Sequence, residues 1–235
     1  MLGSCHAARS VFLVLSSSVA FAGDIAGTVV IQHRLTKPKV TLSVGGYERG
    51  VAVPLQADGA NDPLAAEFGR VVIYVEGAFP AAPKRATMEQ RNRQFVPETL
   101  VLPIGSTVSF PNLDPIFHNV FSLSKPRNFD LGNYPQNQTR TVTFTKPGIV
   151  FVNCHLHPNM SAAIVITPNR WATKADSSGR FDLSDLPPGT YPITAWHRAA
   201  GFFHQTVHVR DGVPATVTFT IPLGDPEPAH TIAHR

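Results

Sequence analysis

The hydrophobic residues of this chain occur in short runs that are rich in β-branched and aromatic side chains. Glycine, proline, asparagine and aspartate separate these runs, with 17 Gly and 21 Pro in the whole sequence. Short runs between turn residues are typical of strands in β-sandwiches. The predicted strands include Thr28–Gln32, Val71–Glu76, Thr107–Phe110, Thr141–Thr145, Ala163–Thr167, Thr206–Arg210 and Thr216–Ile221. The pattern therefore predicts an all-β fold.

Helical periodicity is nearly absent, and one helix of a turn or two is expected within Asp62–Phe68. The two ends of the chain differ from the rest. Residues 1–22 contain Arg9, a short apolar run and the small-x-small sequence Ala20-Phe21-Ala22, which together are typical of a secretory signal peptide. An apolar run of about a dozen residues is short for a membrane span, and an uncleaved anchor is the alternative. Residues 224–235 are rich in proline and predict a flexible tail.

The chain of 235 residues is 43% hydrophobic and 15% charged, which suffices for one large or two small domains. Its formal net charge of +4 is a mild excess that favours an acidic docking partner and not nucleic acid. Cleavage after Ala22 would leave Cys154 as the only cysteine, so the mature chain could form no internal disulfide. A lone exported thiol is a liability unless something occupies it. We therefore expect a periplasmic or secreted protein, with no membrane span in the mature chain, whose cysteine binds a ligand.

Residues 150–160, VFVNCHLHPNM, follow a strand-like run with a cysteine, two histidines and a methionine. A structural zinc site would leave Met160 unused, because thioether is a poor zinc ligand. Covalent haem attachment would need a second cysteine in a C-x-x-C-H motif, and that cysteine is missing. A Cys-His nucleophile stays open, although the sequence shows no orienting acid nearby and only the amide of Asn153 beside the cysteine.

A blue-copper electron-transfer site uses two imidazoles, one thiolate and a weakly bound axial methionine. Cys154, His157 and Met160 recur at every third position, so one tight loop can direct all three side chains at one point. His118, 36 residues before Cys154, supplies the second imidazole from a neighbouring strand end. His155 is the rival ligand, and we expect it to face solvent or the sheet instead. The predicted ligands are His118, Cys154, His157 and Met160, and the predicted cofactor is copper.

Residues 84–168 resemble the cupredoxins, and the C-x-x-H-P-x-M loop is most similar to that of the amicyanins. The resemblance implies a Greek-key β-sandwich with three copper ligands in a trigonal plane and a fourth at a long axial distance. The planar ligands would be His118, Cys154 and His157, and the axial ligand would be Met160. The resemblance also implies that the backbone N–H of Asn119 donates to the Cys154 sulfur, a bond that tunes the reduction potential.

The segments on either side, residues 23–83 and 169–223, predict a second β-sandwich. Residues 172–196, ATKADSSGRFDLSDLPPGTYPITAW, resemble the middle of the small transthyretin-like or carboxypeptidase-regulatory-like sandwiches. The strands that open such a fold are missing just before this stretch. Matching runs, AGTVVI and RVVIYVEG, occur far upstream at 26–31 and 70–77.

These positions favour an insertion of the copper domain, 84–168, into one discontinuous flanking domain. Insertion at a surface loop is mild when the ends of the inserted domain lie close together. An insertion predicts that Val71–Val75 pairs or packs with strands from 180–221. The alternative is a tandem order, in which the N-terminal strands extend the cupredoxin sheet and a separate module follows.

The whole chain also resembles larger exported proteins of the methylamine-utilisation or plastocyanin-like type. This implies a periplasmic type 1 copper protein that carries single electrons between redox partner proteins, such as a cytochrome or a dehydrogenase. The sequence shows no second metal site and no general base of the kind that would indicate an enzyme. A copper carrier or resistance protein without redox turnover is the alternative, but carriers usually have Met-rich or His-rich runs and this chain has three methionines. A third reading is a binding module whose flanking sandwich docks a partner.

Overall fold

The computed structural model describes residues 22–36 and 63–222. The predicted signal peptide, apart from Ala22, and the predicted tail therefore lie outside the described residues. Within these ranges the regular structure is almost entirely β-strand, and the one helix is α1 (Pro63–Phe68), at the predicted position. The predicted all-β fold class is confirmed. In the same ranges, no helix has the length and hydrophobicity that crossing a membrane requires.

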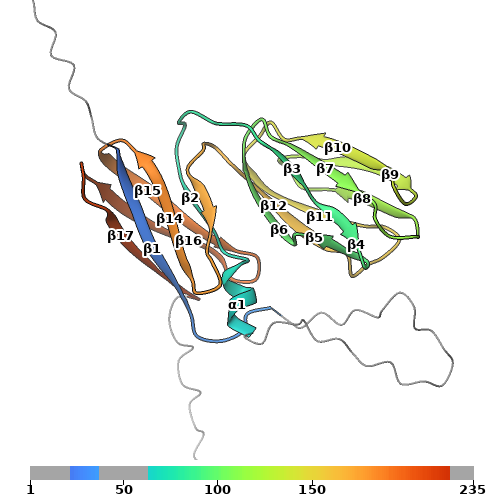
Figure 1. Cartoon of the computed structure of the whole chain (residues 1–235), viewed down its shortest axis with the longest axis horizontal. Coiled ribbons are helices and arrows are strands. Elements are labelled where there is room, and N and C mark those ends of the chain that lie inside the picture. The colour runs from blue at the N-terminus through green and yellow to red at the C-terminus, as the bar shows by residue number, and fades with distance from the viewer. Residues whose placement is uncertain (1–21, 37–62, 223–235) are drawn as a thin grey trace, which may run out of the picture.

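Two β-sandwiches lie side by side (Figure 1). We call the one formed by residues 85–167 the central sandwich. Its five-stranded sheet has the order β6 (Thr99–Pro103), β12 (Ser161–Thr167), β11 (Gly148–Asn153), β8 (His118–Ser122) and β9 (Phe129–Tyr134). Its three-stranded sheet has the order β10 (Thr139–Thr143), β7 (Thr107–Pro111) and β3 (Arg85–Thr87). A hairpin of β4 (Glu89–Arg91) and β5 (Gln94–Val96) completes this part of the molecule.

The core of the central sandwich follows from the alternation of side chains along its strands. In β11, Val150 and Val152 are fully buried whereas Phe151 points outward and is 39% exposed. In β7, Val108 and Phe110 face inward in the same way. The inward side chains of both sheets form one hydrophobic cluster, which also contains Cys154 and Met160. The loop between β11 and β12 is therefore attached to the core at both of its ends.

The flanking sandwich combines strands from before and after the central one (Figure 1). One of its sheets has the order β14 (Arg180–Leu186), β1 (Gly23–Ile31) and β17 (Ala215–Ile221). The other has the order β13 (Ala172–Lys174), β2 (Val72–Val75), β15 (Gly189–His197) and β16 (Gly201–Val209). Inward residues such as Ile25, Ile73 and Phe219 share one hydrophobic cluster.

Strand β2 has the neighbours that an insertion requires. It pairs antiparallel with β15, where Val72 lies opposite Trp196 and Val75 lies opposite Ile193. On its other edge it pairs with β13. Residues from 71–75 and from 180–221 therefore share a sheet, although the whole central sandwich separates them in the sequence.

The two chain crossings between the sandwiches lie next to each other, and Asn169 joins them. Its side-chain N–H groups donate to the carbonyl oxygens of Val75, at 2.9 Å, and Gly77, at 3.0 Å. Its side-chain oxygen accepts from the backbone N–H of Trp171. The buried amide thus ties the outgoing chain to the returning chain, so the ends of the central sandwich lie close together.

A small hydrophobic cluster fills the space between the two sandwiches. Val72 and Trp196 from the flanking sheet pack with Ala163 and Val165 of β12. Because β2 uses Ile73 and Val75 in the flanking core and Val72 in this cluster, it is buried on both faces. This cluster covers the face of the five-stranded sheet that points away from the central core, along β12 and at Ile149 of β11. β11 and β12 are the two strands that the predicted ligand loop connects.

Candidate metal centre

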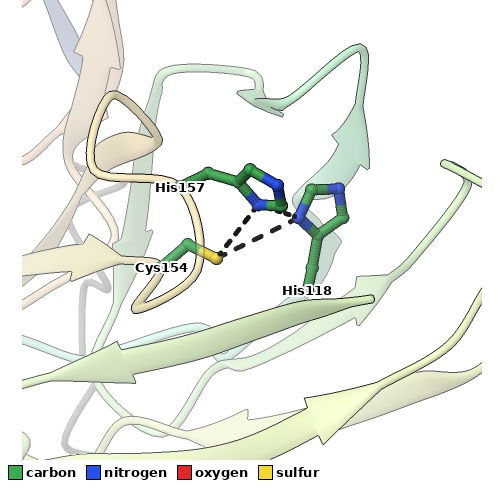
Figure 2. A group of neighbouring side chains, drawn as sticks. All are labelled: His118, Cys154 and His157. Atoms are coloured by element: carbon green, nitrogen blue, oxygen red, sulfur yellow. Dashed lines mark hydrogen bonds between the residues drawn. The ribbon is translucent and has the colours of Figure 1, made fainter. Parts of the chain in front are cut away.

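Three of the predicted ligands converge at one end of the central sandwich (Figure 2). His118 is the first residue of β8, Cys154 directly follows β11, and His157 lies in the loop that leads to β12. The Cys154 sulfur lies 4.0 Å from Nδ1 of His118 and 3.8 Å from Nδ1 of His157. The two Nδ1 atoms are 3.0 Å apart. The fold thus joins residues that are distant in the sequence into one group of donor atoms.

These distances fit a bound metal ion. Metal–nitrogen distances of about 2.0 Å and metal–sulfur distances of about 2.3 Å place the donors of a trigonal plane about 3.5 to 3.7 Å apart. The observed separations of 3.0, 3.8 and 4.0 Å lie around these values. Only small side-chain movements would be needed for His118, Cys154 and His157 to hold one ion.

Cys154 is almost fully buried, with 4% of its surface exposed. Burial opposes the thiolate, but hydrogen bonds from His118 and from the backbone amides of Asn119, Leu156 and His157 lower the pKa of the Cys154 thiol overall. The N–H of Asn119 donates to the sulfur at 3.4 Å, as the resemblance implies. The thiolate is the form of cysteine that binds metals, so the surroundings of Cys154 favour a metal ligand.

A buried carboxylate holds His118 in place. Oδ2 of Asp114 lies 2.8 Å from Nε2 of His118, and both side chains are almost or fully buried. Burial opposes its charge, but hydrogen bonds from the backbone N–H groups of Arg93 and Asn92 and from His118 hold the pKa of Asp114 below its usual value. Asp114 is therefore ionised and accepts a hydrogen bond from Nε2–H of His118, so Nδ1 is the atom that faces the Cys154 sulfur and that would bind a metal.

Asp114 corrects one expectation from the sequence. The sequence showed no acid near the cysteine and histidines, whereas the structure brings Asp114 into contact with His118. Asp114 lies four residues before His118, which is the only trace of this contact in the sequence. The position of the carboxylate also depends on the turn at Asn92 and Arg93, both of which have positive φ angles, 54° and 57°.

His157 lies nearer the surface than His118. Burial, the charge of His118 and the charge of Arg93 lower the pKa of His157. The imidazole is therefore neutral over most of the physiological range and free to bind a metal. The Nε atom of Arg93 is buried and its charge acts on His157, whereas the side chain of Arg91, two residues earlier, is 55% exposed.

Met160 closes the loop and is 1% exposed. Its backbone N–H donates to the carbonyl oxygen of His157 at 2.9 Å, and its side chain belongs to the same hydrophobic cluster as Cys154. These contacts suit an axial ligand and equally suit a core residue. Axial ligation by Met160 therefore stays a prediction.

His155 is not part of the ligand group. Its ring stacks on Phe121, with ring centroids 3.7 Å apart and an interplanar angle of 4°. Its Nε2 lies 3.6 Å from Oδ2 of Asp130, and the side chain is 56% exposed. This orientation agrees with the expectation that His155 faces away from the site. Among the later histidines, His197 is fully buried and His204 is exposed in β16.

No family model and no curated protein matches this chain. A purple cupredoxin from Nitrosopumilus maritimus matches with 19% identity and a TM-score of 0.32, over 35% of this chain and 99% of that one. A Cu(I) form of an amicyanin variant matches with 18% identity and a TM-score of 0.33, over 40% and 97%. A Cu-containing nitrite reductase from Thermus scotoductus SA-01 matches with 22% identity and a TM-score of 0.33, over 59% and 28%.

The structural neighbours are thus cupredoxins and a copper enzyme of which this chain spans about a quarter of the length. TM-scores of this size carry no argument about chemistry. The choice of a metal depends instead on the donor atoms of this chain, two imidazole nitrogens and one cysteine sulfur in a mostly buried group.

Proposed function

We propose that this protein is an exported type 1 copper protein that carries single electrons between redox partner proteins. The observation that carries the proposal is the group of His118, Cys154 and His157, supported by the N–H bond from Asn119 to the sulfur. The buried Met160 at the end of the same loop supports an axial thioether ligand. Two imidazoles, one thiolate and a weak axial methionine are the donor set of blue-copper sites.

Copper bound there would supply a one-electron couple whose potential depends on the ligands and their surroundings. The residues of this chain hold the donor atoms in one arrangement. Asp114 fixes the ring of His118, the amide of Asn119 stabilises the thiolate, and the burial of Cys154 keeps water from the sulfur. A preorganised site of this kind changes little when the charge on it changes.

The contact between Asp114 and His118 also suits a Cys–His–Asp nucleophile. Cys154, however, is 4% exposed, and its sulfur lies between two imidazoles instead of beside one. A substrate carbonyl would have no approach to such a sulfur. We therefore propose that the protein is not an enzyme.

A copper carrier without redox turnover is the second candidate. A carrier has to release its ion, which favours exposed donors, whereas His118, Cys154 and Met160 are all at least 96% buried. This burial supports electron transfer over delivery. The proposed partners are a cytochrome or a dehydrogenase in the periplasm, which the predicted signal peptide supports.

The visible spectrum of the copper-loaded protein tests the proposal. Cu(II) bound by the Cys154 thiolate should give an intense blue or green charge-transfer band and a reversible one-electron couple. Cys154→Ser should abolish the band, because the oxygen donor cannot replace the thiolate, whereas His155→Ala is the matched control and should leave it nearly unchanged. A colourless copper-loaded protein would rule out the electron-transfer function and favour the carrier.

A further inference from the structure

The flanking sandwich contacts the base of the ligand loop. Asn153 and Ser161 face each other at the ends of β11 and β12, and the loop connects them. Cys154 directly follows Asn153, and Met160 directly precedes Ser161. The distance and angle between β11 and β12 at this pair therefore determine where the two sulfur side chains lie.

Arg198, in the turn between β15 and β16, reaches both of these strands. Its Nη2 donates to Oγ of Ser161 at 3.2 Å. Its guanidinium carbon lies 5.3 Å from the centre of the Phe151 ring, within the range of a cation–π contact. Phe151 lies in β11 and contacts Trp196 of the flanking sandwich, with ring centroids 6.5 Å apart. One side chain from the flanking sandwich therefore spans the two strands that carry the loop.

The backbone of this turn is itself held firmly. His197 is fully buried, and its Nε2 lies 3.0 Å from a carboxylate oxygen of Glu67 in α1. The N–H of Ala199 donates to Nδ1 of His197, and the N–H of Ala200 donates to its carbonyl oxygen. His197 is anchored to Glu67, and the amides of Ala199 and Ala200 close the turn onto His197. The backbone of Arg198 is therefore held in place, and its guanidinium projects from a fixed position.

We propose that Arg198 is a positioning residue for the metal centre, which acts through Ser161 and Phe151 to set the position of Met160 relative to Cys154. This inference depends on the proposed copper function for its spectroscopic consequence. The geometric part, that Arg198 restrains the loop, holds for the metal-free protein as well. The flanking sandwich is then a working part of the centre and not only an attached module.

The physical reason lies in how weakly a thioether binds copper. A contact from Met160 to the metal would respond to small changes in loop geometry more than the bonds from His118, Cys154 and His157 would, and the axial ligand tunes the potential of blue-copper sites. A charge-assisted hydrogen bond is stronger than a neutral one. It can therefore hold the start of β12, and with it Met160, against the loop's own freedom to move.

The test compares full-length variants loaded with copper. Arg198→Met should shift the visible band and change the equilibrium constant against a reference redox dye by about threefold, and Ser161→Ala, which removes the hydrogen bond but keeps the Phe151 contact, should shift both in the same direction by no more than that. The double variant should show no further change, because the two residues act as one unit. Arg198→Lys keeps a donor and should lie nearer the parent protein, and Met160→Gln shows the size of a full axial change.

Glu98→Gln is the matched control. Glu98 forms an ion pair with Arg70 of the flanking sandwich, with a nitrogen–oxygen distance of 3.2 Å, across the same interface. Its loss weakens the contact between the sandwiches without touching the loop, so the band and the potential should stay as in the parent. An equal shift in Glu98→Gln would overturn the proposal, because any loosening of the interface would then have the same effect.

Hydrogen exchange of the metal-free protein separates this proposal from the copper function. The Met160 amide, which donates to His157, should exchange about tenfold faster in Arg198→Met, as expected for the loss of one charge-assisted bond. Unchanged exchange, band and potential together with a lower melting temperature would mean that Arg198 only joins the sandwiches. If the parent protein is colourless with copper, the proposed function fails, and the exchange result alone decides the role of Arg198.

Discussion

Asp114 and His118 form the most constrained contact of the site. The carboxylate accepts from Asn92, Arg93 and His118, so it is ionised although it is almost fully buried. A negative charge on the far side of a metal-ligating imidazole fixes the tautomer and makes the ring a stronger donor. It also stabilises the more positive oxidation state of a metal bound to that ring.

Asp114→Asn should therefore raise the reduction potential of the copper-loaded protein. Removing one charge behind His118 is worth about 1 to 2 kcal/mol at an effective dielectric of about 20, which corresponds to about 50 to 100 mV for a one-electron couple. Cyclic voltammetry measures this change. Nitrogen NMR of the metal-free variant should in addition show a mixture of His118 tautomers where the parent has one.

Asp130→Asn is a suitable control for this variant. Asp130 contacts Asn119 and Gly132 and lies near His155, but its side chain is 56% exposed and does not touch His118. Water screens its charge, so the potential should change little. A similar rise in both variants would contradict a specific role for Asp114.

The sequence pointed to His118, Cys154, His157 and Met160 as candidate ligands, but not to the residues that contact them. The regular spacing of Cys154, His157 and Met160 reflects the geometry of one short loop, so it is visible in the sequence. Asp114 and Arg93 act through a hairpin turn and a loop that meet only in three dimensions. Acidic and basic residues on loops are common, and nothing in their spacing marks these two.

The strands were predicted more accurately than their ends. The chain turns at Gly105 and at Ser178-Gly179, and both glycines have the positive φ angles, 84° and 82°, that such turns need. β1 begins at Gly23, five residues before the predicted start, because Gly23 to Gly27 pair with β14 although this stretch is less apolar. Pairing with a neighbouring strand, which a local pattern does not contain, thus decides where a strand ends.

Helix α1 is anchored by a buried polar contact that depends on pH. Glu67 accepts from His197 and Thr36 and faces the charge of Arg70, and despite its burial these partners keep the pKa of Glu67 below its usual value. Burial lowers the pKa of His197, against the opposing effect of the Glu67 and Glu98 charges. Both groups therefore favour the folded state more at neutral than at acidic pH.

His197→Gln should reduce stability at neutral pH and matter less as the pH falls. Folded His197 has a lower pKa than the value of about 6.5 in an unfolded chain. Below that pH the unfolded state therefore binds more protons than the folded state, and acidification destabilises the parent. The variant lacks the imidazole, so it does not undergo this loss of stability. Thermal unfolding between pH 8 and 5.5 measures this, where both limits are about one unit or more from 6.5.

Below a pH of about 4.5 the protonation of Glu67 adds to the loss in the parent and the variant alike. A difference in melting temperature between the two proteins that grows on acidification down to pH 5.5 would mean that His197 is charged in the folded state. The ion pair with Glu67 would then stabilise the fold, contrary to the lowered pKa.

At the scale of the molecule, we propose that the flanking sandwich is one discontinuous domain. The pairing of β2 with β15, the shared core of Ile25, Ile73 and Phe219, and the adjacent crossings at Asn169 support it. The strands before the central sandwich and those after it contribute to the same two sheets, because β1 lies between β14 and β17, and β2 lies between β13 and β15.

A fragment of residues 169–222 should accordingly fail to fold, whereas a chain with 84–168 replaced by a short glycine-serine linker should fold. The linker is sufficient because Asn169 already holds the two crossings together. The shortened chain should be less stable than the parent, since Val72 and Trp196 lose their cover. Circular dichroism and proton NMR distinguish the outcomes, and a fragment that folds alone would favour the tandem order.

The pairing of β1 with β17 also has a consequence for synthesis. β1 is made first among the described strands, but its parallel neighbour is made last. The strands of the central sandwich, by contrast, are contiguous in the chain and can pair as soon as they emerge, since domains generally fold as units during or soon after synthesis. Until β17 arrives, β1 has an open edge of the kind that aggregates. In the nascent chain the central sandwich can thus fold early, whereas the flanking sandwich can be completed only after its last strand, β17, has been made.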